Sequence, residues 1–230
     1  MRLDLGRVVA HMRTSNFREA QGMISHQHRC IFIHIPKTAG TSIEKKLGHF
    51  ETLEAGVQDH RTIRQIQPEP QPFWKECFAK SDAQSVTARQ FRSYYKFTFV
   101  RNPWARAFSW YRNVMDDPRH RAKHQVPDDC SFGDFLKHHS DQWAMRPQLH
   151  WLEAKDGTMP LDFVGRFESL NQDFETVAKR LGLKDQSLPT LMMREGERPS
   201  YVAHYDDELR ELVEARYHKE IERFGYQFGD

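Results

Sequence analysis

The sequence predicts an α/β domain whose central sheet is mainly parallel and flanked by helices. Three short apolar runs, at 30–35, 96–100 and 161–167, have the composition of buried strands, and a helical pattern follows each one. Strands that alternate with helices favour a parallel sheet covered on both faces. The 230 residues fit one domain, to which we assign 30–230. Residues 1–29 are polar and rich in His and Arg, and we expect them to form a loosely held N-terminal arm.

Apolar spacing and capping residues predict the other elements. Helices are expected over 43–47, 73–80, 87–94, 104–115, 132–139, 171–181 and 206–224. Ser131 suits the N-cap of its helix and Gly182 the C-cap position of another. The segment 51–72 ends in three prolines, which excludes a long regular element there. The charged segment 116–129 contains two prolines and is expected to be an exposed loop.

Charge and cysteine content exclude several classes of protein. Lys and Arg number 34 against 32 Asp and Glu, so a nucleic-acid-coating protein is not expected, and any anion site must be local. Cys30, Cys77 and Cys130 have no metal-ligand spacing, which indicates no metal and a reducing compartment. The chain shows no secretory signal pattern and no apolar run of transmembrane length, and we therefore expect a cytoplasmic protein. Nothing in the sequence indicates an oligomeric state.

A loop of small and hydroxyl residues joins the first strand to its helix. Its residues are Pro36, Lys37, Thr38, Ala39, Gly40, Thr41 and Ser42. A helix start offers unpaired N–H groups and a positive dipole end, Gly40 allows close approach, and the hydroxyls add donors. This combination suits a phosphate or similar tetrahedral anion. It is not a Walker A loop, because Lys37 precedes the glycine. The alternative is an ordinary tight connection with a surface lysine.

A second candidate anion contact follows the second strand. Arg101 comes directly after 96–100, at the strand end where open α/β sheets bind ligands. Ser109 lies two turns into the next helix, where its hydroxyl could join Arg101 on a second anionic group. The alternative places Arg101 in a core ion pair. The aromatic residues Trp104 and Phe108 are expected to pack in the core.

These segments resemble a known family. Residues 32–42 and 97–104, with further matches at 162–168 and 201–226, are similar to the sulfotransferase family that includes the carbohydrate (heparan and chondroitin type) enzymes and their bacterial relatives. The resemblance covers roughly 30–228. It implies a three-layer fold like that of P-loop NTPases, and 3′-phosphoadenosine 5′-phosphosulfate (PAPS) as sulfuryl donor without a metal.

The resemblance also implies roles for individual residues. Lys37 through Ser42 would hold the 5′-phosphosulfate, and Arg101 with Ser109 would hold the 3′-phosphate. The loop before the last helix would fold over the nucleotide, with Arg198 reaching the 3′-phosphate and Tyr201 nearby; a solvated loop arginine is the alternative. Arg166 and Glu168 are expected to form a structural ion pair.

Transfer to a hydroxyl needs a base, and we choose His60 among thirteen histidines. The resemblance suggests a catalytic histidine in the stretch 59–64, while Lys37 would stabilise charge on the leaving oxygen. A solvated loop histidine is the alternative for His60, and the carboxylates of Glu51, Glu54 and Asp59 stay possible as bases. His34, within the first strand run, is expected to be buried and hydrogen-bonded.

The predicted function is transfer of a sulfuryl group from PAPS to an alcohol, with a sugar or glycan-like acceptor. The loops 51–72 and 116–151 are expected to shape the acceptor cleft, and Trp143 and Trp151 would either stack on a sugar or pack in the core. One competing hypothesis is a nucleotide kinase or NTPase of related fold, which would need a magnesium-holding motif. Another is a non-catalytic nucleotide-binding module that keeps the anion-binding loop.

Overall fold

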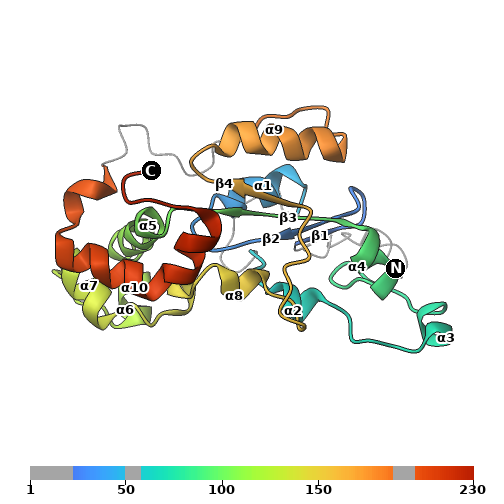
Figure 1. Ribbon diagram of the computed structural model, residues 1–230, viewed down its shortest axis with the longest axis horizontal. Helices are drawn as coiled ribbons and strands as arrows, with labels where there is room; N and C mark the ends of the chain where they lie inside the picture. Colours follow the sequence, from blue (N-terminus) through green and yellow to red (C-terminus); the bar gives the residue numbers. More distant parts are fainter. Residues whose placement is uncertain (1–22, 50–57, 189–199) are drawn as a thin grey trace, which may run out of the picture.

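A four-stranded sheet forms the centre of the computed structural model, which describes residues 23–49, 58–188 and 200–230 (Figure 1). The strands lie in the order β1 (Ile24–Ser25), β2 (Cys30–Ile33), β3 (Tyr95–Val100) and β4 (Phe163–Arg166). β1 pairs antiparallel with β2, while β2, β3 and β4 are parallel. The mainly parallel α/β sheet predicted from the sequence is therefore confirmed.

Helices surround the sheet on both faces. They are α1 (Gly40–Lys46), α2 (Ile63–Ile66), α3 (Phe73–Glu76), α4 (Ala88–Ser93), α5 (Pro103–Met115), α6 (Pro118–His124), α7 (Phe132–His138), α8 (Leu149–Leu152), α9 (Leu170–Leu181) and α10 (Asp207–Phe224), with 3-10 turns η1 (Trp143–Met145) and η2 (Tyr201–His204). In Figure 1, α1 and α9 lie on one face of the sheet and α2 and α8 on the other. α5, α6, α7 and α10 form a lobe at the end of the sheet where β3 runs into α5.

Two apolar cores separate these layers, because side chains alternate along each strand. Phe32 and Phe97 point to the core under α1 and α9, where Phe174 packs against them. Ile31 and Ile33 point to the opposite core, which extends into the helical lobe. All five side chains are fully buried, so the sheet is covered on both faces.

Two sequence expectations need correction. Met23, Ile24 and Ser25 are buried and β1 joins the sheet edge, so the end of the expected N-terminal arm is part of the fold; residues 1–22 lie outside the described chain. The expected loop 116–129 contains α6, whose first turn is capped by Asp117. An Asp-Pro pair is typical of a helix start, but the high charge of the segment favoured the prediction of a loop.

Short elements also differ from expectation. α3 is only four residues long, and its residues Phe73 and Trp74 are exposed, as is Phe78 after it. α2 was not expected, although Thr62 and Gln65 form a capping box at its start. By contrast, the predicted caps Ser131 and Gly182 are confirmed, the former accepting the Asp134 N–H and the latter taking a left-handed conformation.

Gly40 is required by packing at the start of α1. A Cβ added there would lie 1.9 Å from Cδ2 and 2.1 Å from Nε2 of His34. The His34 ring is buried and its Nδ1 lies 2.7 Å from Oε1 of Glu44, so it cannot swing aside without losing that bond. The glycine therefore serves the close approach of an imidazole, where the sequence had suggested only the approach of a ligand.

We expect Gly40→Ala to lower the free energy of unfolding by about 2 kcal/mol, as overpacking of a rigid site does. Gly133→Ala is the control, because its added Cβ would meet nothing nearer than 3.7 Å; its effect should stay within about 1 kcal/mol. Urea unfolding of both variants measures the difference. Equal free energies for the two variants would show that the His34 contact does not restrict position 40.

Candidate functional site

The loop between β2 and α1 has an unusual backbone. Lys37 has a φ of 70° and Ala39 a φ of 67°, whereas Thr38 and Gly40 between and after them do not have positive φ. Left-handed conformations are costly for residues with a Cβ, and they concentrate at functional sites. Alternation of hand turns successive backbone N–H groups toward one side of the chain, which makes an anion-binding concavity. The loop therefore has a backbone conformation that could bind an anion.

The hydroxyl groups of this loop have different roles. Thr38 is fully buried and donates to the carbonyl of Ile35 at 2.9 Å, so it holds the loop shape. Thr41 is buried in the first turn of α1, and its hydroxyl accepts a hydrogen bond from the Gln58 amide. Ser42 is half-buried one residue later. Only Thr41 and Ser42 are placed where a hydroxyl could supplement the backbone donors of the helix start.

Lys37 is held beside a second cation. Its Nζ donates to Oδ1 of Asn113 at 2.9 Å, and its carbonyl accepts from Nη1 of Arg101 at 3.2 Å. Burial, and next the charge of Arg101, lower the pKa of Lys37 to about 8. Two cations brought this close in a partly buried place favour the binding of an anion. This contact places the two cations, which the resemblance assigns to different groups of one nucleotide, beside each other.

Arg101 is positioned by a buried amide. The backbone N–H of Arg101 donates to Oε1 of Gln148, and Nε2 of Gln148 donates to the Arg101 carbonyl, both at 2.8 Å. Gln148 is in turn held by the carboxyl of Glu220, and both side chains are fully buried. The Arg101 guanidinium stacks on the ring of Phe167 at 4.0 Å. These contacts fix the turn after β3 relative to α8 and α10.

Ser109 shares a helix with the residue that holds Lys37. Ser109 and Asn113 are four positions apart in α5, so they lie on the same face of the helix. Because Asn113 reaches Lys37, this face of α5 is turned toward the β2–α1 loop. Ser109 is half-buried there, one turn nearer to Arg101 along the chain.

His60 stands at the end of β2. Its Nδ1 lies 3.0 Å from the carbonyl oxygen of His34, and since a carbonyl only accepts, Nδ1 carries the proton. The lone pair of the neutral ring is then on Nε2. Burial, and next the charge of His34, lower the pKa of His60 to about 4, so the ring is neutral near pH 7. This is the tautomer and charge state that a general base needs.

Aromatic side chains surround the His60 ring. The His34 ring lies 4.0 Å away between centroids, and the Trp143 ring meets the His60 ring edge-on at 5.1 Å. Trp143 is 44% exposed, whereas Trp151 behind it is fully buried. The open question about these two tryptophans is thereby answered: Trp151 belongs to the core, and Trp143 borders the site.

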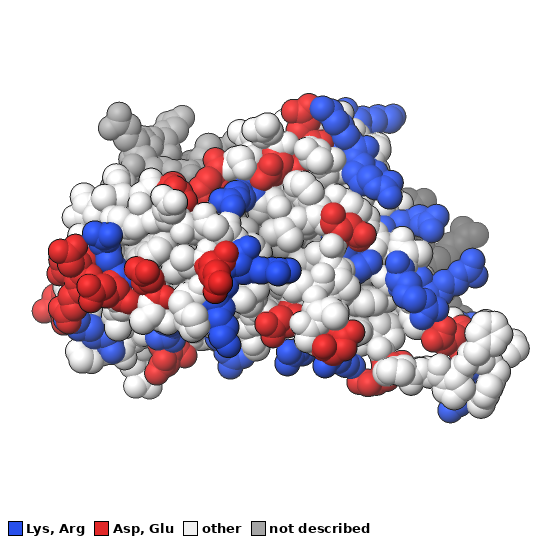
Figure 2. Space-filling view, viewed as in Figure 1, with Lys and Arg blue, Asp and Glu red and all other residues white. Residues whose placement is uncertain are grey.

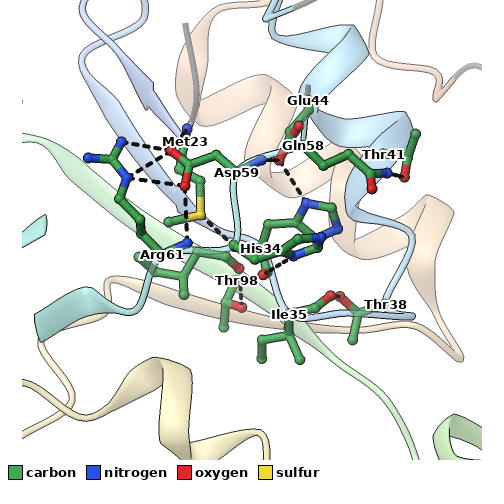
Figure 3. A network of polar contacts seen from close by, with 12 residues as sticks. Met23, His34, Ile35, Thr38, Thr41, Glu44, Gln58, Asp59, Arg61 and Thr98 are labelled. Atoms are coloured by element: carbon green, nitrogen blue, oxygen red, sulfur yellow. Dashed lines mark hydrogen bonds and ion pairs between the residues drawn. The ribbon is translucent and has the colours of Figure 1, made fainter. Parts of the chain in front are cut away.

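The other carboxylates proposed as bases are placed differently. Asp59 is bound by the Arg61 guanidinium and by the backbone N–H of Met23 (Figure 3). Burial opposes the charge of Asp59, but these hydrogen bonds keep its pKa below its usual value. Both carboxyl oxygens of Asp59 already accept hydrogen bonds from these donors, which favours His60. Glu51 and Glu54 lie outside the described residues.

The residues expected near the C-terminus have other contacts. Tyr201 accepts the Gly229 N–H at 2.7 Å and packs on Phe228, so its hydroxyl is engaged with the end of the chain. Arg198 lies outside the described residues. The expected ion pair of Arg166 and Glu168 does not form. Arg166 donates to the carbonyl of Phe224, and Glu168 accepts from the Asn102 N–H and the Tyr226 hydroxyl, because the C-terminal turn packs between them.

Asn113, Gln148 and Glu44 were not identified from the sequence. An isolated amide or carboxyl has no local pattern, and their partners lie 10 to 76 positions away along the chain. The one available signal is position, since Asn113 is one helical turn beyond Ser109 in the same predicted helix.

Charged side chains are unevenly distributed on the surface. On the face shown in Figure 2, acidic side chains gather over α7 and α10, and Lys and Arg gather near α4 at the opposite end. Neither sign covers the whole face.

Within the described ranges, no cluster of three His, Cys, Asp or Glu side chains could hold a metal ion. In the same part of the chain, no helix is long and apolar enough to cross a bilayer.

Comparison with known proteins gives the family. The sequence pattern of the "Sulfotransferase family" matches residues 21–227. Carbohydrate sulfotransferase 14 of Danio rerio is 25% identical over 188 residues, which cover 70% of this chain and 48% of that protein. The protein of the same name from Homo sapiens is 24% identical over 184 residues, covering 67% of this chain and 45% of that protein.

The chain thus spans about half the length of the curated relatives it matches. No solved structure matches it significantly. The family pattern nevertheless extends from β1 to the end of the C-terminal turn, and it includes both strand ends that carry Lys37 and Arg101. With nine-tenths of its length inside that pattern, the chain belongs to the sulfotransferase family.

Proposed function

We propose that this protein transfers a sulfuryl group from PAPS to a hydroxyl group, with a carbohydrate as the acceptor class. The observation that carries the proposal is the convergence of the β2–α1 loop, Arg101 and the neutral imidazole of His60 at the carboxyl ends of β2 and β3. Family membership supports PAPS as the donor, and the names of the relatives support the acceptor class.

The donor would occupy two neighbouring groups of contacts. The backbone N–H groups of the loop, with Lys37, Thr41 and Ser42, suit the 5′-phosphosulfate, and Arg101 with Ser109 suits the 3′-phosphate. The Arg101 guanidinium lies 3.2 Å from the carbonyl of Lys37, so one nucleotide can reach both. The excess of positive charge in a partly buried place supports a dianionic group as the occupant.

The chemistry would be an in-line displacement at sulfur. The acceptor oxygen forms a bond to sulfur while the bond from sulfur to the phosphate oxygen breaks, which leaves adenosine 3′,5′-bisphosphate. Nε2 of His60 takes the proton of the acceptor hydroxyl, and Lys37 stabilises the negative charge that develops on the leaving oxygen. Positioning and charge stabilisation of this kind account for most catalysis in the related phosphoryl transfers.

The acceptor would lie beside Trp143. An exposed indole next to the base offers an apolar face on which a sugar ring can stack, and the ring edge of Trp143 already contacts His60. A non-catalytic nucleotide-binding module would need the loop and Arg101 but would have no use for an oriented imidazole.

Two measurements separate these functions: calorimetric titration with adenosine 3′,5′-bisphosphate and with ATP in the absence of magnesium, and transfer of label from PAPS to a panel of carbohydrate acceptors. Binding of the bisphosphate alone, with label transfer, supports the proposal. ATP binding without label transfer contradicts it.

We expect the affinity for adenosine 3′,5′-bisphosphate to fall as pH rises above 8. The free Lys37 has a pKa of about 8, and only its protonated form attracts the anion. The association constant should be level below that pH and then fall by up to about tenfold per pH unit. Calorimetry between pH 7 and 9.5 measures this. The control is Lys37→Arg, whose guanidinium stays charged. A wild-type profile identical to that of the arginine variant would exclude Lys37 from the binding contact.

We expect His60→Gln to lower kcat by about 10²- to 10⁴-fold, the usual contribution of a general base. The dissociation constant of the bisphosphate should stay within about threefold, because His60 is not among the residues proposed to bind it. Steady-state transfer assays and calorimetry measure the two constants. His138→Gln, a change at an exposed histidine of α7, is the matched control. Unchanged kcat in His60→Gln would remove His60 from the reaction.

A further inference from the structure

Glu44 is a buried acid close to His60 that has no role in the chemistry proposed above. Glu44 lies in α1 and is fully shielded from solvent, and His34 beside it is 2% exposed. Oε1 of Glu44 lies 2.7 Å from Nδ1 of His34 (Figure 3). Its other oxygen, Oε2, is buried and has no hydrogen-bond partner within the described chain. A buried carboxyl with one unpartnered oxygen costs folding free energy, so its presence needs a reason.

Glu44 contacts both parts of the chain that define the position of His60. Its Oε1 is hydrogen-bonded to Nδ1 of the His34 ring. The backbone carbonyl of His34 in turn accepts a hydrogen bond from Nδ1 of His60. Oε1 also accepts the backbone N–H of Asp59, the residue before His60, at 3.4 Å. One carboxyl group therefore joins the helix that begins at the anion-binding loop to the segment that carries the base.

The His34 ring transmits this constraint by packing. It lies against the backbone of Gly40 on one side, and its centroid is 4.0 Å from that of His60. Because Gly40 allows no space for movement, rotation of the His34 ring would displace the His60 ring and break the hydrogen bond between His34 and Glu44. Burial raises the pKa of Glu44 to about 8 and lowers that of His34 to about 3, which keeps the pair free of net charge near pH 7.

We propose that Glu44 is a positioning residue for His60: its hydrogen bonds to the His34 ring and to the Asp59 amide hold the His60 imidazole with its proton on Nδ1 and its lone pair on Nε2. The proposal rests on the proposed function for its catalytic consequence, but the tautomer of His60 is a property of the protein alone. Second contacts of this kind orient active imidazoles in many sites, and their loss commonly costs 10- to 100-fold in activity.

Three variants test this role. Glu44→Leu fills most of the volume and removes both hydrogen bonds, and Glu44→Met offers a more adaptable apolar chain if leucine fits poorly. Glu44→Gln keeps an amide oxygen in the place of Oε1. Glu175→Leu, at an exposed position of α9, is the surface control.

We expect kcat to fall about 10- to 100-fold in the apolar variants and to return to within about threefold of wild type in Glu44→Gln. The dissociation constant of adenosine 3′,5′-bisphosphate should be unchanged in all of them. A purely structural role would move both constants together and would not be rescued by glutamine. Unchanged kcat in the apolar variants, or a glutamine variant as impaired as they are, would overturn the proposal.

Nitrogen-15 chemical shifts of the His60 ring give a second readout that needs no acceptor. We expect the Nδ1–H tautomer in wild type, in Glu44→Gln and in Glu175→Leu, and a mixture of tautomers in the apolar variants. An unaltered tautomer in folded apolar variants would overturn the positioning role. If wild type transfers no sulfuryl group but the tautomers follow this pattern, the proposed function fails while the role of Glu44 stands.

Discussion

β2 and β3 run parallel with Cys30 opposite Tyr95 and Ile33 opposite Thr98, so both strands end at the same edge of the sheet. This register brings Lys37 and Arg101 within reach of each other, although they are 64 positions apart. A slip of β2 by one residue against β3 would turn Phe32 from the α9 core toward the opposite layer. Packing in the apolar cores therefore fixes the register of β2 and β3, and this register sets the positions of Lys37 and Arg101.

Bringing the positive charges of Lys37 and Arg101 together costs free energy. Lys37 and Arg101 repel each other, and burial removes part of the water that would screen them. Nearby, burial keeps His34 and His60 uncharged, so the cations and the imidazoles form two regions of different electrostatic character. An anion bound at the first region would relieve the repulsion, and under the proposed function the second region would supply a neutral base for an uncharged hydroxyl. This division suits transfer of a charged group to a neutral acceptor.

Local patterns predicted the fold well where they were long. The strand runs at β2, β3 and β4 and the long helices α5, α9 and α10 appear close to their expected bounds, because periodic burial leaves a direct trace in the sequence. β1 has only two residues, which is too short to show an alternation of apolar side chains. α6 is so highly charged that its composition favoured a loop despite the Asp-Pro pair at its start. Short elements such as these depend on what packs beside them.

The sequence by itself determined the family motifs and the positions of Lys37 and Arg101 after strand ends, since these follow from residue type and local order, and through the family resemblance it made His60 a candidate base. Only the tertiary structure decided how these groups are held: Asn113 on Lys37, Gln148 on Arg101, and the His34 carbonyl on His60. Hydrogen bonds between side chains far apart in sequence leave no periodic pattern. They form where the packing of the layers brings donor and acceptor within about 3 Å, and that distance is a property of the folded chain.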